Sequence, residues 1–600
     1  MGRIAKTEDN IVSIPKSVSV TAKGYVYWNA TTTWVDKANG TGKRADHKKE
    51  CIGVILCPGS DWKKDRRMYA NPTYYQIFPS NKGSSQNTQD DKAATARKEY
   101  PQRFDCISVG LYAVVDKLAE ESGLYDVLLD VFGTENTQLI MDLAMYMISG
   151  ETAVMQHFPH WAASHAIFSD SIRSDSFISA FEKEISLSLI NKFKNSWAPV
   201  ALGDGRVFVC YDSTNTNSRA KGVFLVQKGH AKDDPEEDQV NTEYVIRQKD
   251  GLPITFNVYP GSINDISQFR YMVDKVMSYG YKNIGFILDR GYFDQDNIEY
   301  MDKMGFSFIM MVKGCRKLVS SLIQEKRNTF ETKRSCCIRA YKVYGTTETA
   351  KLYAGDEKER YFHIYYNPYR QAYEREKLEA DLDRYKKDME KAKETEMTFG
   401  DTYKKYFNLI YNNKKFVGYT EKEDVIEYEL ETAGYFCIVT SESMTAEQAL
   451  IQYKGRDISE KLFQADKSFI GSKSMRVHSK EALSAKIFLE FTALIVRNRI
   501  YNLLKETMLK LDSNPNYLTV PAAIRELEKL EMVRLNNGRY QLDHAISKRQ
   551  RIILSSFGID DDKVKDAAGE ISNILKNVKD PDIQPDEEAE NGENEVDYFD

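Results

Sequence analysis

Four side chains in one short stretch of the chain have types and spacing that suggest a single chemistry. They are Tyr453, Arg456, Glu460 and Lys467. If this stretch is helical, at roughly 100° per residue, these four side chains fall within roughly 60° of one another. An acid alone would suit a solvated helix face. An acid flanked by groups that bind phosphate favours a metal-dependent reaction on a polyanion.

Two aspartates follow predicted buried strands and could join Glu460. Asp212 comes directly after Val207–Tyr211, and Asp289 directly after Ile284–Leu288. Carboxylates at one edge of a sheet, with one from a neighbouring helix, can hold two divalent ions roughly 4 Å apart. An aspartate after a strand is, taken singly, more often a turn or cap residue. The pattern around Glu460 is more specific, because three spacings must hold at once.

The segments that must position these acids have the sequence pattern of an α/β core. Short apolar strands alternate with helices from Gly203 to Gly314, which is typical of a sheet with parallel strands. The alternation stops over Cys315–Thr432, which we interpret as an insertion. It resumes at Gly434, where Thr445 is a plausible cap for the helical stretch that reaches Glu460. A long apolar helix, Lys480–Leu504, is expected to pack behind.

The remaining segments divide by composition. The start of the chain alternates β-branched and aromatic residues with turn residues, the next long segment has helical periodicity, and Asn537-Gly538 predicts a hairpin near the C-terminus. The helical segment could bind DNA or serve equally well in packing or dimerisation. We therefore expect a β-rich domain at 1–79, a linker at 80–98, a helical domain at 99–198, the first segment of the core at 199–314, the insertion at 315–432, the second segment of the core at 433–506, a small C-terminal α/β unit at 507–578, and an acidic disordered tail at 579–600.

Composition and charge limit the possible classes of protein. The chain has 600 residues, so several domains are expected. Its formal net charge is −6, but Asp580–Asp600 holds ten acids and no base, so the rest is mildly basic. That balance permits nucleic-acid binding without demonstrating it. No apolar run is long enough to span a bilayer, and the eight cysteines have no regular spacing, so we expect a cytoplasmic protein with reduced thiols and no membrane partner.

The pattern Tyr-x2-Arg-x3-Glu-x6-Lys resembles the signature of the insertion-sequence transposases of the DDE class, in the branch named for those four residues. The match is complete at Tyr453, Arg456, Glu460 and Lys467. Further stretches that resemble the family are Val209–Thr216 around the first acid, Gly251–Ile254 with Tyr259–Asp265, and Ile287–Asn297 around the second acid. The resemblance covers about Gly203 to Leu504 and neither end of the chain.

The resemblance implies a ribonuclease-H-like core, interrupted by a largely β insertion ahead of its glutamate. It also implies cut-and-paste transposition by a bacterial, nucleoid-associated enzyme. The enzyme would bind terminal inverted repeats, cleave DNA and join the ends to target DNA, with two repeats paired by a homodimer. Asp212, Asp289 and Glu460 would be the catalytic residues and would bind Mg²⁺ or Mn²⁺ as a pair of ions. Tyr453, Arg456 and Lys467 would contact DNA phosphates.

One departure from the family concerns tryptophan. Some relatives open the flanking DNA as a hairpin and stack a flipped base on a tryptophan in the insertion. All five tryptophans here precede the core: Trp28, Trp34, Trp62, Trp161 and Trp197. Two other functions remain possible: an inactive DNA-binding protein derived from a transposase, and a ribonuclease-H-like nuclease that cuts DNA without strand transfer.

Overall fold

The computed structural model of the chain forms two compact units, residues 1–99 and residues 100–600. No described helix is both long and apolar enough to cross a membrane. The described residues are 11–15, 18–21, 23–36, 43–56, 66–78, 103–150, 152–229, 234, 236–263, 265–280, 283–312, 317–353, 355–471, 474–475, 477 and 479–577. The expected tail at 579–600 and the whole of the expected linker at 80–98 lie outside these residues.

The first unit is a five-stranded antiparallel sheet with one short helix. The strand order is β1-β5-β4-β3-β2. Alternate apolar side chains, such as Val26, Ile52 and Met68, form its small core. Its elements are β1 (Ile11–Ser13), β2 (Val18–Val20), β3 (Tyr25–Asp36), β4 (Lys43–Ile55), β5 (Arg67–Ala70) and α1 (Pro72–Ile77).

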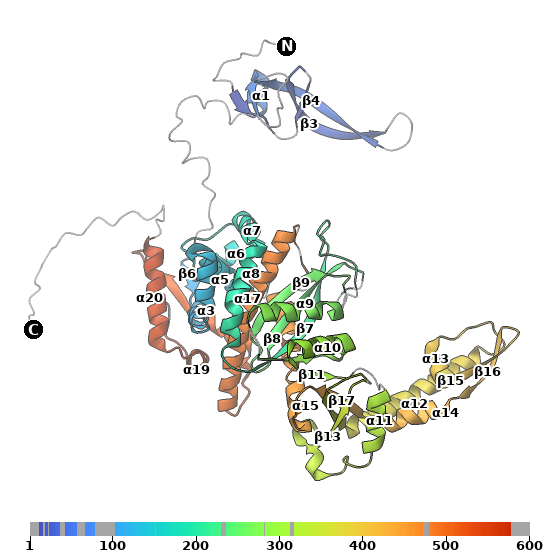
Figure 1. The fold of residues 1–600 in the computed structure, drawn as a ribbon. Coiled ribbons are helices and arrows are strands. Elements are labelled where there is room, and N and C mark those ends of the chain that lie inside the picture. The colour runs from blue at the N-terminus through green and yellow to red at the C-terminus, as the bar shows by residue number, and fades with distance from the viewer. Residues whose placement is uncertain are drawn as a thin grey trace, which may run out of the picture. The chain divides into compact units, whose positions relative to one another are not determined.

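The second unit is built on one large mixed sheet with helices around it (Figure 1). Its strand order is β12-β13-β14-β17-β11-β10-β7-β8-β9, and β18 pairs with β7. The central strands β7, β10 and β11 are parallel to one another, and the outer ones are antiparallel. The strands are β7 (Val207–Ser218), β8 (Gln239–Arg247), β9 (Pro253–Pro260), β10 (Ile284–Leu288), β11 (Ser307–Met311), β12 (Cys337–Ile338), β13 (Val343–Lys351), β14 (Glu359–Tyr366), β17 (Tyr435–Thr440) and β18 (Ser474–Met475). The prediction of a mixed α/β chain is therefore confirmed.

The helix α17 (Lys480–Lys510) lies at the centre of the second unit. Its residues 483–497 are all buried, because other helices and the strand β9 surround it. The helices that pack around α17 or on the main sheet include α3 (Gly110–Glu121), α4 (Leu124–Phe132), α5 (Thr134–Gly150), η3 (Met155–His157), α6 (Phe158–Ala163), α7 (Asp175–Glu184), α8 (Leu187–Leu202), α9 (Asp265–Ser278), η4 (Arg290–Tyr292), α10 (Gln295–Met304), α15 (Ala446–Lys454), α16 (Asp457–Gln464) and the π-helical η7 (Ala465–Ile470).

The prediction of a largely β insertion was wrong. Some of the inserted segment extends the main sheet as β12–β14, and much of the rest is helical. The inserted helices and remaining strands are α11 (Lys317–Lys326), η5 (Arg334–Cys336), η6 (Arg339–Tyr341), α12 (Pro368–Lys391), α13 (Asp401–Tyr406), β15 (Phe407–Asn412), β16 (Lys415–Glu421) and α14 (Glu423–Thr432). The long α12 is rich in Glu, Lys and Arg, which favour helix, so its own composition outweighs the β content that the resemblance implied.

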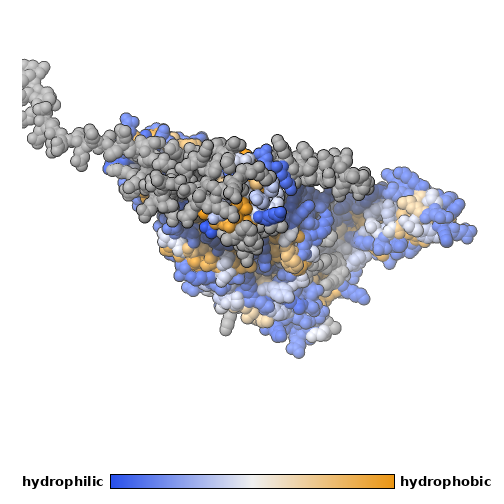
Figure 2. All heavy atoms as spheres, turned by 90° about the horizontal axis from the view of Figure 1, so that it is seen from above, coloured by the Kyte–Doolittle hydropathy of each residue, from blue (hydrophilic) through white to orange (hydrophobic). Residues whose placement is uncertain are grey.

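Residues 368–432 form an arm that reaches away from the main sheet (Figure 1). The arm has its own hydrophobic core, in which Leu382, Tyr385 and Met389 of α12 pack against β15, β16 and α14. These three residues follow one another at intervals of three and four, so they lie on one face of α12. The face of the arm seen in Figure 2 has mostly hydrophilic residues around a smaller hydrophobic patch. The arm is therefore a separately packed element of the second unit.

A third, three-stranded sheet joins two distant segments of the chain. β6 (Cys106–Ser108), which lies near the start of the segment expected to be helical, pairs with β19 (Glu531–Arg534), and β19 pairs with β20 (Tyr540–Leu542). The sequence suggested two separate segments here, but in the structure they share one sheet and one core. The C-terminal helices are η8 (Asn516–Leu518), α18 (Val520–Leu527), α19 (Lys548–Ser556) and α20 (Asp561–Asn577).

Candidate active site

The two aspartates are brought side by side by neighbouring parallel strands. In the register of β7 and β10, Tyr211 lies opposite Leu288, so the next residue on each strand is Asp212 and Asp289 respectively. Asp289 ends its strand, as predicted, and caps η4, where its Oδ1 accepts a hydrogen bond from the Arg290 amide at 2.7 Å. Both carboxylates therefore lie at the same edge of the sheet.

Asp212 does not end its strand, which differs from the prediction. β7 continues to Ser218, because β8 pairs with it from Val209 to Asn217, including the pair Asp212 and Tyr244. The polar run after Asp212 has the composition of a turn, yet its side chains are buried between other elements. Long-range pairing outweighed local turn propensity here.

The glutamate is carried by a helix that is interrupted ahead of it. Thr445 caps α15 with a capping box, as expected, but α15 ends at Lys454 and α16 begins at Asp457. The expected single helix is therefore two helices, followed by the π-helical η7 that carries Lys467. Glu460 lies in the first turn of α16 and is 69% exposed.

Arg456 is the group on which all three acids converge. Its Nη1 lies 3.2 Å from Oδ2 of Asp212, and its Nη2 lies 3.7 Å from Oδ1 of Asp289. The same Nη2 lies 4.0 Å from Oε1 of Glu460. The Arg456 side chain is only 15% exposed. Burial by itself lowers the pKa of Arg456, but the neighbouring charges, Asp289 first, outweigh it and raise the pKa above its ordinary value.

Tyr453 also contacts the acids. It is buried, and its hydroxyl donates a hydrogen bond to Oδ1 of Asp289 at 3.4 Å. Burial, with Asp289 nearby, raises the pKa of Tyr453 to about 12, so it remains a proton donor at neutral pH. Lys467 is half-buried on η7, on a different helical segment from Arg456 and Glu460. The structure thus gathers Asp212, Asp289, Glu460, Tyr453 and Arg456 directly.

A turn that the sequence did not identify as important supports α16, the helix that carries Glu460. Gly251, between β8 and β9, has φ of +72°, and a Cβ there would lie 2.7 Å from Cγ1 of Ile458 on α16. Asn498 and Asn502 of α17 donate hydrogen bonds to the Asp250 carbonyl, at 3.0 and 2.6 Å. The turn is thereby fixed between α16 and α17. The stretch Gly251–Ile254 was noted only within the resemblance, and its spatial role is visible only in the fold.

Buried polar groups fix the strand that carries Asp212. Glu243 on β8 is fully buried and accepts hydrogen bonds from the Tyr211 hydroxyl and from the Asn257 amide. The Tyr292 hydroxyl donates to Ser213 Oγ at 3.3 Å, which ties β7 to η4 just after Asp289. These bonds hold the residues on either side of Asp212. Sequence analysis did not select Glu243, because a single glutamate within a strand has no distinctive spacing.

The three acids have the ligand chemistry that a divalent metal needs, but their spacing in this structure suits a metal less well. Three carboxylates supply the oxygen ligands that Mg²⁺ and Mn²⁺ prefer. Among the residues that the structure describes, however, no group of three or more His, Cys, Asp or Glu side chains is close enough to form a metal site. The carboxylates instead surround the guanidinium of Arg456. The donor set therefore fits a metal, provided that the acids draw closer together than they are here.

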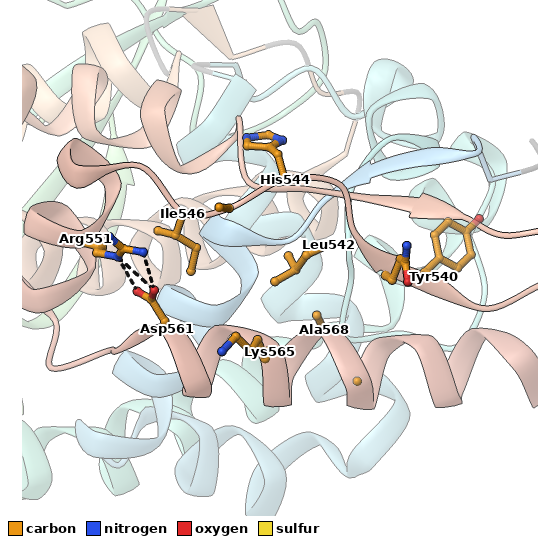
Figure 3. A pocket seen from close by; sticks show the side chains of 11 residues that line it. Tyr540, Leu542, His544, Ile546, Arg551, Asp561, Lys565 and Ala568 are labelled. Atoms are coloured by element: carbon orange, nitrogen blue, oxygen red, sulfur yellow. Dashed lines mark hydrogen bonds and ion pairs between the residues drawn. The ribbon is translucent and has the colours of Figure 1, made fainter. Parts of the chain in front are cut away.

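Two cavities elsewhere in the second unit lack such a donor set. One, of about 580 Å³, lies between β20 and α20, where Arg551 and Asp561 form an ion pair (Figure 3). The other, of about 330 Å³, lies on the opposite side of α16 from the acids and is lined mainly by apolar side chains, including Ile458 and Leu462. Neither cavity is lined by two or more carboxylates, so the edge of the main sheet remains the candidate active site.

Comparison with known proteins agrees with this location. Residues 203–496, which contain every residue of the site, match the family described as the transposase DDE domain. No curated protein matches the sequence. One similar solved structure is a piggyBac transposase synaptic complex with hairpin DNA, at 10% identity and a TM-score of 0.30, covering 79% of each chain. A likeness that distant adds nothing to the assignment, so the similarity to the family over residues 203–496 is the comparison that matters.

Proposed function

We propose that this chain is a transposase that binds the terminal inverted repeats of an insertion sequence and catalyses metal-dependent DNA cleavage and strand transfer. The observation that carries the proposal is the convergence of three acids, distant in sequence, on one guanidinium within 4.0 Å. The match of residues 203–496 to the transposase DDE domain supports it independently. The substrate is then DNA, and the reaction is phosphoryl transfer.

Asp212, Asp289 and Glu460 are the proposed metal ligands and catalytic residues. Two bound Mg²⁺ or Mn²⁺ ions would activate the attacking water or 3′-hydroxyl and stabilise the leaving oxygen. The role of the protein is to keep the three carboxylates at one edge of the main sheet. β7 and β10 fix Asp212 and Asp289, and α16 brings Glu460 against them. Asp212 and Asp289 each accept a hydrogen bond from the backbone amide of the next residue, which restricts the orientation of both carboxylates.

Arg456, Tyr453 and Lys467 are the proposed contacts to DNA phosphates. An arginine fork can bind a phosphate through two parallel hydrogen bonds, and a lysine acts as a point charge. Arg456 is anchored at the break between α15 and α16, beside the acids, so a phosphate bound there lies next to the reacting groups. We further propose that two copies of the chain pair two transposon ends before joining them to target DNA.

The substitution Glu460→Gln tests the proposal most directly. It removes one carboxylate charge while keeping the side chain's shape, so cleavage of a terminal-repeat duplex should fall by at least about 100-fold. Binding of the same duplex, measured by gel shift, should change little. Asp457→Asn is the matched control, because Asp457 is an exposed acid in the same first turn of α16 and is not one of the three proposed metal ligands. Equal cleavage by Glu460→Gln and by the wild type would reject the assignment.

A strand-transfer assay with precut ends separates the proposed function from its alternatives. A transposase should join the 3′ ends to a target plasmid when Mg²⁺ is present. A nuclease of the same fold would cut the uncut duplex but join nothing. An inactive descendant would bind the duplex and do neither, which would contradict the proposed enzyme.

A further inference from the structure

We propose that Arg456 is an internal cation for the acid set, by which we mean Asp212, Asp289 and Glu460. Before metal binds, Arg456 holds these three carboxylates together. When metal binds to the carboxylates, Arg456 releases them and binds a DNA phosphate. Metal binding and DNA binding are therefore coupled through this one side chain. The inference rests on the proposed function, because it takes the acids as metal ligands and DNA as the substrate. It assigns Arg456 a positioning role in addition to its contact with DNA.

The first step of the argument is charge. Asp212, Asp289 and Glu460 repel one another when ionised, and a shared site for like charges is unfavourable without a cation. Arg456 supplies that cation: its Nη1 contacts Asp212 at 3.2 Å, and its Nη2 lies 3.7 Å from Asp289 and 4.0 Å from Glu460. A planar guanidinium with five donors can bridge acids on several elements, which a lysine ammonium does less well. The set is thus held together without a metal.

The second step is competition for the same oxygens. Mg²⁺ binds carboxylate oxygens at about 2.0–2.1 Å, so acids that share an ion must lie closer together than acids that surround a guanidinium. The Nη2 of Arg456 lies 3.7 Å from Oδ1 of Asp289 and 4.0 Å from Oε1 of Glu460, so it occupies space next to oxygens of two of the acids that would share an ion. A divalent ion there also repels the positive guanidinium. The metal and the guanidinium therefore exclude each other from the centre of the set.

The third step is where the displaced guanidinium goes. Arg456 follows Gly455, at the break between α15 and α16, so its backbone is not within the body of either helix. Its side chain is enclosed by the acids and by Tyr453, whose ring centre lies 5.9 Å from its guanidinium carbon. A DNA phosphate at this edge offers the same fork-shaped partner that the carboxylates offered. Metal binding thus frees a phosphate-binding group, and by linkage DNA binding must tighten metal binding by the same factor.

The test measures the affinity for Mn²⁺ directly, by the electron paramagnetic resonance signal of the free ion, with the full chain and no reaction. Arg456→Gln should bind Mn²⁺ about tenfold or more tightly than the wild type in the absence of DNA. Arg290→Gln is the matched control, since Arg290 is exposed and directly follows Asp289. It removes one charge near the same acid and should change the affinity by less than about threefold.

A second measurement repeats the titration with a duplex that cannot be cleaved. DNA should tighten Mn²⁺ binding by the wild type by about tenfold, and this gain should shrink to less than about threefold in Arg456→Gln. Arg456→Lys, which keeps the charge but not the fork, should lie between the two. The wild-type arm needs no variant to fold, and the absence of any effect of DNA there would overturn the inference.

The outcomes separate the inference from the proposed function. If wild type and Arg456→Gln bind Mn²⁺ equally, or the variant binds more weakly, Arg456 does not compete with the metal and the inference is wrong, while the proposed function stands. If neither binds Mn²⁺, with or without DNA, the acids are not metal ligands and both fall.

Discussion

Gly251 lies in the turn between β8 and β9 and touches the helix that carries Glu460, so the substitution Gly251→Ala should damage the site from a distance. Its φ of +72° is a conformation that alanine adopts only with strain, at about 1–2 kcal/mol. The new Cβ would also lie 2.7 and 2.8 Å from Cγ1 and Cδ1 of Ile458. Overpacking of this kind costs about 1–3 kcal/mol. The free energy of unfolding should therefore fall by about 2–5 kcal/mol.

Activity should fall further than this loss of stability alone explains. Ile458 is two residues from Glu460 on α16, so relief of the clash by movement of the helix displaces the carboxylate. A shift of about 1 Å at a reacting group can reduce a rate by about 100-fold. The assays are urea denaturation, followed by circular dichroism, and the rate of duplex cleavage at a temperature where the variant is folded.

Gly455→Ala is the matched control, since Gly455 is the glycine at the start of the same helix break. Its φ of −58° suits alanine. A new Cβ would approach Nε2 of Gln248 more closely than the Cβ at Gly251 approaches Ile458, but that atom is the end of a flexible side chain that can move away; the nearest backbone atom is the Gln452 carbonyl oxygen, at 3.1 Å. That substitution should cost less than about 1 kcal/mol and leave cleavage nearly unchanged. In an Ile458→Ala background, Gly251→Ala should cost only the backbone strain, about 1–2 kcal/mol. If Gly251→Ala lowered the free energy of unfolding equally in the wild type and in Ile458→Ala, the clash with Ile458 would be refuted. A Gly251→Ala variant with full stability and activity would refute the close packing of Gly251 against α16.

Two further predictions concern a buried histidine and the hydroxyl beside Asp289. His363 is fully buried between Thr347 Oγ1 and Thr440 Oγ1, at 2.9 and 3.0 Å, and burial lowers its pKa to about 4. The unfolded chain takes up this proton near pH 6.5, so stability should fall by at most about 3 kcal/mol as the pH drops from 6.5 to 4. His363→Gln should remove that component of the pH dependence in urea denaturation, and an unchanged slope would contradict the assignment. Tyr453→Phe removes one hydrogen bond to Asp289 and should slow cleavage by roughly 2–10-fold with a melting temperature nearly unchanged; an unaltered rate would show that this bond does not orient Asp289.

Local pattern alone identified much of the site. The helical spacing of Tyr453, Arg456 and Glu460 survives the break at Gly455, because both flanking segments remain helical and keep about the same angular step. The capping box at Thr445 and the strand that ends before Asp289 are also local features, and both are confirmed. A residue's neighbours within a turn or a strand are set by its own sequence, so such features can be predicted.

The tertiary structure decided what the sequence could not. β7 runs on past Asp212 because β8 pairs with it, and β6 joins β19 across more than 400 residues of chain. The contact of Gly251 with Ile458 and the buried Glu243 under Tyr211 likewise depend on segments that meet only after folding. Above all, the convergence of the acids on Arg456 follows from the order of the strands in the sheet and the path of α16. Pairing and packing between distant segments have no period in the sequence, and for that physical reason the fold alone determines them.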